Sequence, residues 1–435
     1  MTVRAVYTHS EVMQMDNSIL RGRATADSGG TLSNWPVVIL TFLAVLFDGY
    51  DTTSLGLAVP TLAKQWQVSP AAFTAPLTVT NIGVVIGYLV CGRASARFSR
   101  RTVILTGVCL YAVGSVFTAL STNIETMTIV RLIGGVGLGL VLPAAVSFAT
   151  AHNPGHRREM IAVLVTMGIS GGALLGGLTA GRLITSYGWT SMFWVGAVCP
   201  ALLLPFLWRF LRKETPAPSQ HEPKQSQAAG VREIFTGGLA VRTVLLWAFA
   251  FLLFAAYYGL SSWVPTFMTG YGFTRTAAPL GVAALGVGGL AGALVVIVCS
   301  TRWPTVRVLM VTCVLAAGLM ATVATVPLSK AAVLLVFTGI GGGLTAALVG
   351  QAGVAASLYP QAARTTGVGW ASALGRIGSV IGPALAGLLI SVGASAGMIV
   401  LLGCVPVILG AGTMAIYSRH RSRNVVNGAL VILEQ

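Results

Sequence analysis

Two carboxylates stand in an otherwise apolar stretch, LFDGYDTTSLGLAVP at residues 46–60. Asp48 and Asp51 are three residues apart, so a helix would present them on one face, toward the same cavity. Burying an ion away from water is costly, and two acids in one low-dielectric site cannot both stay ionised cheaply. An acid that binds and releases a proton is what proton coupling requires. The pair therefore predicts proton coupling, and a structural salt bridge or a packing hydrogen bond is the alternative.

Two basic residues also lie inside apolar runs. Arg376 lies in ALGRIGSVIGP, where a guanidinium would stay charged and could bind a carboxylate through two parallel hydrogen bonds. It predicts a receptor for an anion or, as the alternative, a permanent ion pair with Asp48 or Asp51. Arg131 opens RLIGGVGLG and could neutralise an aspartate, relay a proton, or extend outward toward Glu125.

The composition indicates which solvent surrounds these residues. Of the 435 residues, 55% are hydrophobic and only 9% are charged, whereas about a quarter of the residues in a soluble protein are charged. The 53 glycines fit transmembrane helices that pack closely. The formal net charge of +16 does not indicate nucleic-acid binding, because the basic residues are spread over short loops and do not form one patch. The chain is therefore expected to lie in a lipid bilayer.

No constellation in the sequence supports catalysis or metal binding. The six cysteines lie within or at the ends of apolar runs and form no C-x-x-C pair, so neither disulfides nor a metal site is expected. The five histidines are scattered over tails and loops, and no Ser–His–Asp set or phosphate loop is present. We therefore expect no catalytic residues, no metal, no cofactor, and a protein that is not an enzyme.

Apolar runs of about 20 residues, the length that crosses a bilayer core, predict an all-α membrane protein with twelve transmembrane helices. The predicted spans are 36–59, 76–96, 102–122, 126–150, 160–185, 190–210, 241–269, 276–299, 304–326, 331–358, 364–391 and 396–418. Between the sixth and seventh spans, a polar stretch rich in Pro, Gln, Ser and charge predicts a linker. The predicted organisation is an N-terminal tail 1–33, a six-helix half 34–211, a cytoplasmic linker 212–240, a second six-helix half 241–418 and a C-terminal tail 419–435.

An internal repeat relates the two predicted halves. At one constant spacing, residues of the fourth and fifth spans align with identical residues of the tenth and eleventh: Gly135 with Gly341, Gly137 with Gly343, Pro154 with Pro360, Arg158 with Arg364, Gly172 with Gly378, Gly176 with Gly382 and Gly181 with Gly387. Parallel six-helix repeats joined by a linker are typical of a transporter that rocks one half against the other around a site at the bilayer midplane.

The lysines and arginines predict the orientation, because cytoplasmic loops of membrane proteins are enriched in them. With the N-terminus inside, nearly all basic residues of the loops and tails are cytoplasmic, and only Lys64, Arg182, Arg275 and Lys330 fall outside. Both termini are therefore expected in the cytoplasm. The first 33 residues are polar and contain no apolar signal core, so we expect a cytoplasmic tail and not a cleaved leader.

Together these motifs resemble the major facilitator superfamily and, within it, the aromatic acid:proton symporter family. DGYD, followed by a Gly and VP, resembles that family's acidic signature, and ALGRIGSVIGP resembles its eleventh-helix pattern. GWTSMFWVGA resembles its sixth-helix entrance, and RLIGGVGLG resembles the superfamily's fourth-helix proton-transfer motif. The resemblance covers about residues 34–418.

The resemblance implies a major facilitator fold and import of a benzoate- or hydroxybenzoate-type carboxylate with protons, by a monomer in a bacterial inner membrane. Asp48 and Asp51 would then serve proton coupling, and Arg376 would bind the substrate carboxylate or form a charge pair. Four further residues are candidates for lining the substrate, the last of them through a hydrogen bond to a ring hydroxyl: Tyr50, Tyr257, Tyr258 and Gln351.

One loop departs from the superfamily's pattern. Between the second and third spans that pattern reads G-x-x-x-D-R-x-G-R-R, and this chain reads GRASARFSRR. Gly92, Arg97, Arg100 and Arg101 match, whereas Ala96 replaces the acid and Ser99 the second glycine. Because that acid is thought to hold the halves together on the cytoplasmic side, its absence predicts a weaker gate and a shift toward inward-open forms.

Two other functions compete with import. A proton-driven antiporter would export aromatic or drug-like compounds, but antiporters tend to carry G-x-x-x-G-P-x-x-G-G in the fifth span, where this chain has Ala173 in place of the proline. A membrane sensor would bind an aromatic acid without moving it, but the short loops and the lack of a signalling domain argue against that function. Import is therefore favoured.

Overall fold

The computed structural model describes residues 34–154, 157–211, 231–236, 239–360 and 363–433. The predicted tail 1–33 and most of the predicted linker 212–240 lie outside the described residues. Within them, twelve spans are long and apolar enough to cross a membrane, and no strand occurs, which confirms the predicted all-α architecture with twelve transmembrane helices.

The first group of helices lies between Trp35 and Phe210. It consists of α2 (Trp35–Gln65), the short 3-10 helix η1 (Pro70–Phe73), α3 (Thr74–Arg97), α4 (Arg100–Ala119), α5 (Ile124–Ala151), α6 (Arg158–Thr166), α7 (Gly168–Tyr187) and α8 (Thr190–Phe210). Together α6 and α7 form one membrane span that is interrupted at Met167.

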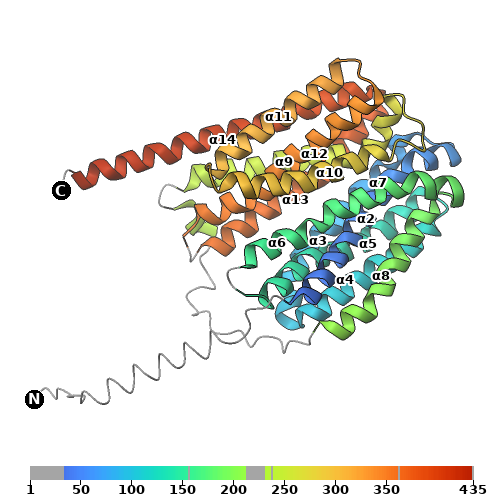
Figure 1. Ribbon diagram of the computed structural model, residues 1–435, viewed down its shortest axis with the longest axis horizontal. Coiled ribbons are helices and arrows are strands. Elements are labelled where there is room, and N and C mark those ends of the chain that lie inside the picture. The colour runs from blue at the N-terminus through green and yellow to red at the C-terminus, as the bar shows by residue number, and fades with distance from the viewer. Residues whose placement is uncertain (1–33, 155–156, 212–230, 237–238, 361–362, 434–435) are drawn as a thin grey trace, which may run out of the picture.

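The second group follows the linker. It consists of the 3-10 helix η3 (Val231–Phe235), α9 (Ala240–Gly270), α10 (Leu280–Ser300), α11 (Thr305–Thr325), α12 (Lys330–Leu358), α13 (Arg364–Ser391) and α14 (Ala396–Leu433). Figure 1 shows α2–α8 gathered in one bundle and α9–α14 in another.

Most predicted spans end within a few residues of the observed helices, but two helices continue farther. The first runs on to Gln65, past Pro60, and α14 continues past residue 418 through the predicted C-terminal tail to Leu433. A helix does not have to end where the bilayer ends, and no proline interrupts α14 after Pro406. Hydropathy locates the apolar part of such a helix but not its last turn.

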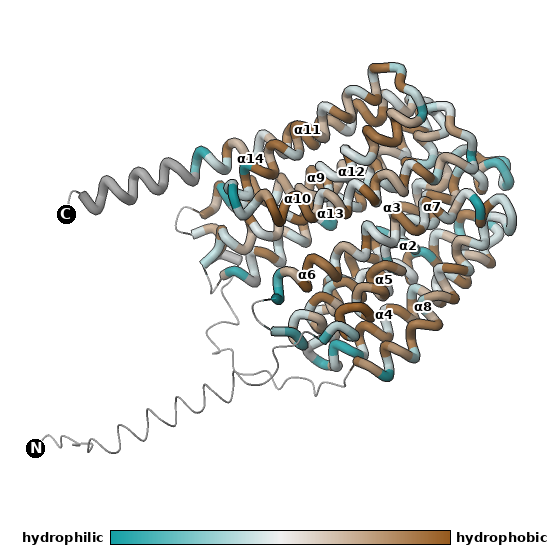
Figure 2. The backbone as a smooth tube through the Cα atoms, viewed as in Figure 1, coloured by the Kyte–Doolittle hydropathy of each residue, from teal (hydrophilic) through white to brown (hydrophobic). Residues whose placement is uncertain are grey.

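The outer faces of the bundle suit a lipid environment. Large apolar side chains are exposed along most spans, for example Leu202, Val314 and Leu335 at 60% or more of their surface. Figure 2 shows the apolar residues along the lengths of the helices and the hydrophilic ones mainly near their ends. An exposed apolar surface of this extent is typical of a protein solvated by acyl chains.

Glycines allow neighbouring helices to approach closely. A side chain at Gly83 of α3 would collide with the backbone of Leu132 in α5, and one at Gly135 would collide with the backbone of Thr80. Lipid tails are as apolar as the side chains, so close packing replaces the hydrophobic effect as the main force between membrane helices.

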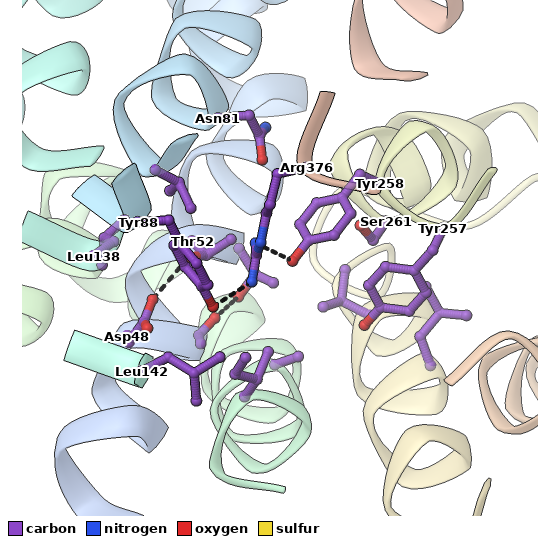
Figure 3. A pocket seen from close by; sticks show the side chains of 17 residues that line it. Asp48, Thr52, Asn81, Tyr88, Leu138, Leu142, Tyr257, Tyr258, Ser261 and Arg376 are labelled. Carbon is purple, nitrogen blue, oxygen red and sulfur yellow. Dashed lines mark hydrogen bonds between the residues drawn. The ribbon is translucent and has the colours of Figure 1, made fainter. Parts of the chain in front are cut away.

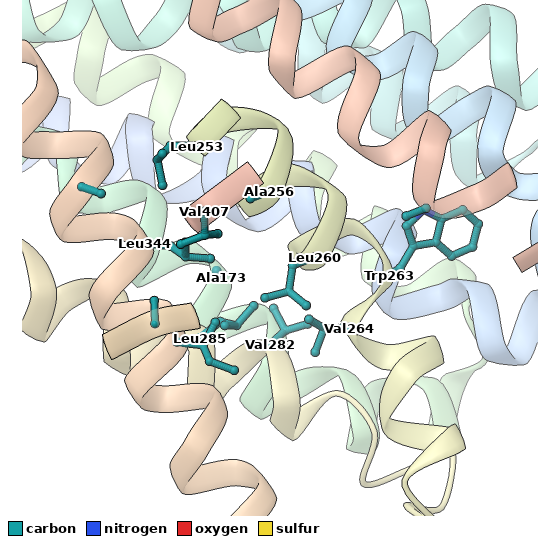
Figure 4. Close-up of a cluster of buried hydrophobic side chains, with 14 of the residues drawn as sticks. Ala173, Leu253, Ala256, Leu260, Trp263, Val264, Val282, Leu285, Leu344 and Val407 are labelled. Atoms are coloured by element: carbon teal, nitrogen blue, oxygen red, sulfur yellow. The ribbon is translucent and has the colours of Figure 1, made fainter. Parts of the chain in front are cut away.

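The two bundles touch at one end of the helices. At this end, which we call the η1 end, lie η1, the α9–α10 connection at 271–279 and the α13–α14 connection at 392–395. Glycine contacts join the bundles there, among them Gly56 of α2 with Ser262 of α9, Gly181 of α7 with Thr276, and Gly387 of α13 with Thr74. Apolar side chains of α7 and α10, among them Ala173, Val282 and Leu285, continue one buried core from bundle to bundle (Figure 4).

The Gly56 contact makes a testable prediction about this closure. A Cβ at Gly56 would lie 2.5 Å from the backbone oxygen of Ser262, so Gly56→Leu cannot fit while α2 and α9 touch. We expect this variant to hold the bundles apart at the η1 end. In a background without the six native cysteines, a Ser261→Cys thiol should then react several-fold faster with an impermeant maleimide added on the η1 side.

The matched control is Gly318→Leu in α11, because a Cβ at Gly318 would meet no atom within 4 Å. This control should label at the parent rate. Equal labelling of the Gly56→Leu and Gly318→Leu proteins would show that the contact does not close the η1 end.

Candidate functional site

A polar pocket lies between the two bundles at mid-length of the helices (Figure 3). Its free volume is about 40 Å³. Helices α2, α3 and α9 supply most of the polar side chains, and α13 supplies the one cation. The polar and aromatic lining residues are Asp48, Thr52, Thr53, Asn81, Tyr88, Tyr257, Tyr258, Ser261 and Arg376.

Arg376 reaches from α13 to tyrosines of both bundles. Its Nη1 donates to the Tyr258 hydroxyl of α9 at 3.1 Å, and its Nη2 donates to the Tyr88 hydroxyl of α3 at 2.5 Å. Its guanidinium carbon lies 4.2 Å from the centroid of the Tyr88 ring, close enough for a cation–π contact. The guanidinium therefore bonds to neutral hydroxyls, which a carboxylate could replace.

Asp48 lines the same pocket from α2. Its side chain is 7% exposed, and its Oδ1 accepts a hydrogen bond from the Thr52 hydroxyl at 3.3 Å. Within the described residues, neither Asp48 nor Arg376 has an oppositely charged side chain at ion-pair distance. The alternative of a permanent ion pair between Arg376 and an aspartate is therefore not what this conformation contains. An acid and a base face one pocket without direct contact.

Asp51 has a different environment. Its Oδ2 accepts from Arg131 Nη1 at 2.9 Å, and its Oδ1 accepts from the Ser115 hydroxyl. Arg131 also donates to the backbone oxygen of Asp51 at 3.3 Å and to the Thr80 hydroxyl at 3.1 Å. Asp51 is 1% exposed and Arg131 3%. Of the three roles open to Arg131, the structure contains the neutralisation of an aspartate.

The two aspartates therefore do not share a cavity, although the sequence predicted one. Residues three apart on a helix differ in direction by about 60°. On α2 this difference is enough for the two aspartates to face different neighbours. Asp48 faces the pocket, whereas Asp51 faces α4 and α5, which carry Ser115 and Arg131.

The four candidates for lining the substrate also divide. Tyr257 and Tyr258 line the pocket, with their ring centroids 5.3 Å apart. Tyr50 is fully buried on another side of α2, where its hydroxyl donates to the Met192 sulfur at 3.5 Å, and it does not line the pocket. Gln351 is buried in α12 and does not line it either.

Sequence reasoning missed Tyr88, Asn81 and Ser261. An aromatic residue in a membrane span is usually a packing or interfacial residue, so the sequence contains no signal that distinguishes Tyr88 from the others. Asn81 was the better clue, because an amide in a membrane span is costly unless it bonds. Its Nδ2 donates to the Leu77 backbone oxygen at 3.0 Å.

The loop between α3 and α4 mainly binds its own bundle. Arg101 Nη2 donates to the backbone oxygen of Trp208 in α8 at 2.5 Å, and its guanidinium lies 5.4 Å from the Trp208 ring centroid. Arg97 lies 5.9 Å from the ring centroid of the adjacent Phe98. Ser99, which replaces the usual glycine, caps α4 by accepting from the Thr102 amide at 3.2 Å.

The remaining members of the predicted gating loop mark helix ends. Arg100 is the first residue of α4. Gly92 lies in the last turns of α3, where a Cβ would meet no atom within 4 Å, so close packing does not require a glycine there.

Comparison with known proteins identifies the family. Residues 41–354 match the family profile described as Major Facilitator Superfamily, which is well over half of the chain. The chain belongs to the major facilitator superfamily. Membership in this superfamily identifies a membrane transporter and not an enzyme.

Several relatives of this major facilitator protein have names that specify a cargo. It is 30% identical over 393 residues to the 4-hydroxybenzoate transporter PcaK of Pseudomonas aeruginosa, covering 82% of this chain and 87% of that protein. It is 27% identical over 386 residues to the gallate transporter of Pseudomonas putida, covering 82% of this chain and 86% of that protein. The family resemblance predicted from the sequence is confirmed.

Solved structures support the fold. A bacterial homologue of the human lysosomal transporter Spinster, in an inward-facing and unoccupied conformation, aligns with a TM-score of 0.71 at 17% identity, over 90% of this chain and 98% of that one. A D-xylose–proton symporter aligns with a TM-score of 0.70 at 17% identity, over 88% and 97%.

The buried pair in this major facilitator protein makes a stability prediction. Removing one partner of a buried ion pair leaves an uncompensated charge, which costs about 3–5 kcal/mol. We therefore expect Asp51→Asn to lower the thermal unfolding temperature of the detergent-purified protein markedly. The double variant Asp51→Asn/Arg131→Met should regain part of the loss, because no unpaired charge remains.

The control is Glu125→Gln, which removes an acid from the exposed first turn of α5. It should leave the unfolding temperature nearly unchanged. A double variant less stable than Asp51→Asn alone would contradict the idea that the unpaired charge causes the loss.

Proposed function

We propose that this protein imports an aromatic carboxylate of the benzoate or hydroxybenzoate class together with protons, by alternating access. Support comes from the names of its relatives, among them a 4-hydroxybenzoate transporter and a gallate transporter. A benzoate transport protein of Acinetobacter baylyi, 25% identical over 91% of this chain and 92% of that protein, adds to this support. We further propose that it acts as a monomer in a bacterial inner membrane, with both termini in the cytoplasm.

Arg376 is the observation that carries the proposal. Its two hydrogen bonds to the hydroxyls of Tyr88 and Tyr258 leave it without a carboxylate partner at ion-pair distance in the described part of the chain. A substrate carboxylate would replace these hydroxyls as a bidentate acceptor, and bonds between ionised groups are about twice as strong as neutral ones.

The rings around the guanidinium suit an aromatic substrate. Phe254 stacks on Tyr258 with centroids 5.9 Å apart, and Tyr257 meets Tyr258 edge to face at 5.3 Å. Aromatic rings attract one another in these geometries by about 0.5–1.5 kcal/mol beyond burial of their area. Polar groups of Thr52, Asn81 and Ser261 would remain for ring hydroxyls.

The balance of charge explains why a proton would accompany the anion. In the described part of the chain, the charged side chains within the bundles are two acids, Asp48 and Asp51, and two bases, the buried Arg131 and the half-buried Arg376, so their sum is zero. An anionic substrate makes the site negative, and a proton on Asp48 restores neutrality. Because an unbalanced charge in a low-dielectric interior is costly, the loaded site would cross between states most readily with both.

The pocket must widen to hold this cargo. Its free volume of about 40 Å³ is far below the several hundred Å³ typical of ligand pockets. We infer that movement of the predicted halves 34–211 and 241–418 opens it, because Arg376 and Asp48 belong to different halves and the Tyr88 bond crosses between them.

Uptake of radiolabelled 4-hydroxybenzoate into vesicles, driven by an inward proton gradient, tests the proposal. Arg376→Gln removes the charge that would bind the carboxylate, and two charge-assisted hydrogen bonds are worth about 1.5–3 kcal/mol each. We expect uptake at low substrate concentration to fall about 100-fold or more. Arg302→Gln in the exposed α10–α11 loop is the matched control and should transport normally.

The variant Asp48→Asn tests proton coupling separately from substrate binding. This variant cannot change its charge, so we expect it to lose gradient-driven accumulation while it still exchanges substrate for substrate across the membrane. Normal accumulation by both Asp48→Asn and Arg376→Gln would refute the assigned roles. Release of substrate in exchange for entering protons would refute the direction and favour the exporter.

A further inference from the structure

A second hollow lies between the same two helices that carry the central pocket. Along α2 the central pocket is lined by Asp48 and Thr52, and Lys64, just over three turns beyond Thr52, lines the second hollow. Along α9 the corresponding residues are Tyr258 and then Thr266. The hollow has a volume of about 710 Å³ and lies at the η1 end, where the bundles meet. We call it the η1 hollow.

Basic residues from both bundles surround the η1 hollow. Lys64 comes from the last turn of α2 and Arg275 from the α9–α10 connection, and no acid is among the lining residues. The Lys330 Nζ lies 5.9 Å from the centroid of the Phe273 ring, which lines the hollow. Among the described acids, only Glu125 lies near this end of the helices. A concave site lined by one sign of charge concentrates the opposite ions.

The uncharged lining completes an anion site. The Thr266 hydroxyl is buried and has no hydrogen-bond partner in the described part of the chain, although its backbone oxygen accepts from the Thr269 hydroxyl at 2.7 Å. A buried hydroxyl without a partner loses about 1–3 kcal/mol, which an acceptor in the hollow would restore. The Phe273 ring adds an apolar wall. Cations, a spare donor and a ring match a carboxylate attached to an aromatic group.

The η1 hollow and the central pocket are separated by the Gly56–Ser262 contact. Gly56 lies between Thr52 and Lys64 along α2, and its backbone approaches that of Ser262, which lies between Tyr258 and Thr266 along α9. An anion in the hollow therefore reaches Arg376 only when α2 and α9 separate. That same movement would part Lys64 from Arg275 and loosen their hold on the anion.

We propose that the η1 hollow is a capture site, in which Lys64 and Arg275 bind the carboxylate of an aromatic acid before it passes to Arg376. This inference rests on the proposed function, because it takes the substrate class and the direction of transport from it. A capture site raises the local concentration of substrate at the mouth. It therefore lowers KM and leaves the rate at saturation, kcat, unchanged.

The test compares initial uptake of radiolabelled 4-hydroxybenzoate into right-side-out vesicles by the full-length protein and by Lys64→Gln/Arg275→Gln. At low ionic strength we expect the double variant to raise KM about tenfold, the lower end of the 10–10³-fold range by which charge steering raises association rates. Its kcat should stay within about twofold of the parent value. Because about 0.5 M salt shortens the screening length to a few Å, the two KM values should then converge.

Arg182→Gln is the matched control. It removes a basic residue from the same end of the molecule, but Arg182 does not line the η1 hollow. Its KM should equal that of the parent. An equal rise in KM for Arg182→Gln would attribute the effect to general surface charge and overturn the capture site.

Other outcomes are equally decisive. An unchanged KM in the double variant, or a fall in kcat alone, would overturn the capture site while leaving the proposed function intact. Impaired release from inside-out vesicles with normal uptake would place the η1 hollow on the other membrane face and would also overturn it. If the unaltered protein takes up no aromatic acid at all, the proposed function itself fails. Uptake by the unaltered protein alone decides this, without the variants.

Discussion

The cost of a charge in a low-dielectric interior governs this structure. In the described part of the chain, four charged side chains stand within the bundles, and they are arranged in two different ways. Asp51 and Arg131 form a direct ion pair whose partners all belong to α2–α5, so the pair moves as one body with its bundle. Asp48 and Arg376 come from different bundles and share a pocket without contact. The first pair is a fixed part of the fold, whereas the spacing of the second changes whenever the bundles move.

Glycines determine how far the bundles can move. At the η1 end Gly56 and Gly181 meet backbone atoms of the other bundle and Gly387 meets the Thr74 side chain, so a side chain at any of these glycines would collide with the other bundle. Contacts of this kind form over a short range and contain few side chains that must rearrange. They can therefore open and close without disturbing the close helix packing inside each bundle, such as the approach of α3 to α5 at Gly83 and Leu132. Glycine therefore allows close contact both between the bundles at the η1 end and between neighbouring helices within each bundle.

The sequence predicts the spans well, because apolar runs of membrane length are rare in soluble proteins. It also predicts which charged residues lie within the spans, because so few charges occur inside such runs. It does not predict which charges pair. Whether Asp48 or Asp51 meets Arg131 depends on a rotation of about 60° around α2, which hydropathy does not encode. Tyr88 was missed because its contact with Arg376 joins α3 to α13, and no local pattern reports a contact across 288 positions. The spacing of Lys64 and Arg275 in one hollow also depends on tertiary packing.

Different interactions act between the bundles at the two ends of the molecule. At the other end, the arginine-rich loop between α3 and α4 lacks the acid of the superfamily pattern, and Arg101 instead bonds to the backbone of Trp208 in its own bundle. An arginine held there contributes little to holding the bundles together. At the η1 end, glycine contacts favour closure, and the gathering of Lys64 and Arg275 opposes it. Because like charges repel, these two basic residues weaken a closure that the glycine contacts favour, and the η1 end can open when the bundles move.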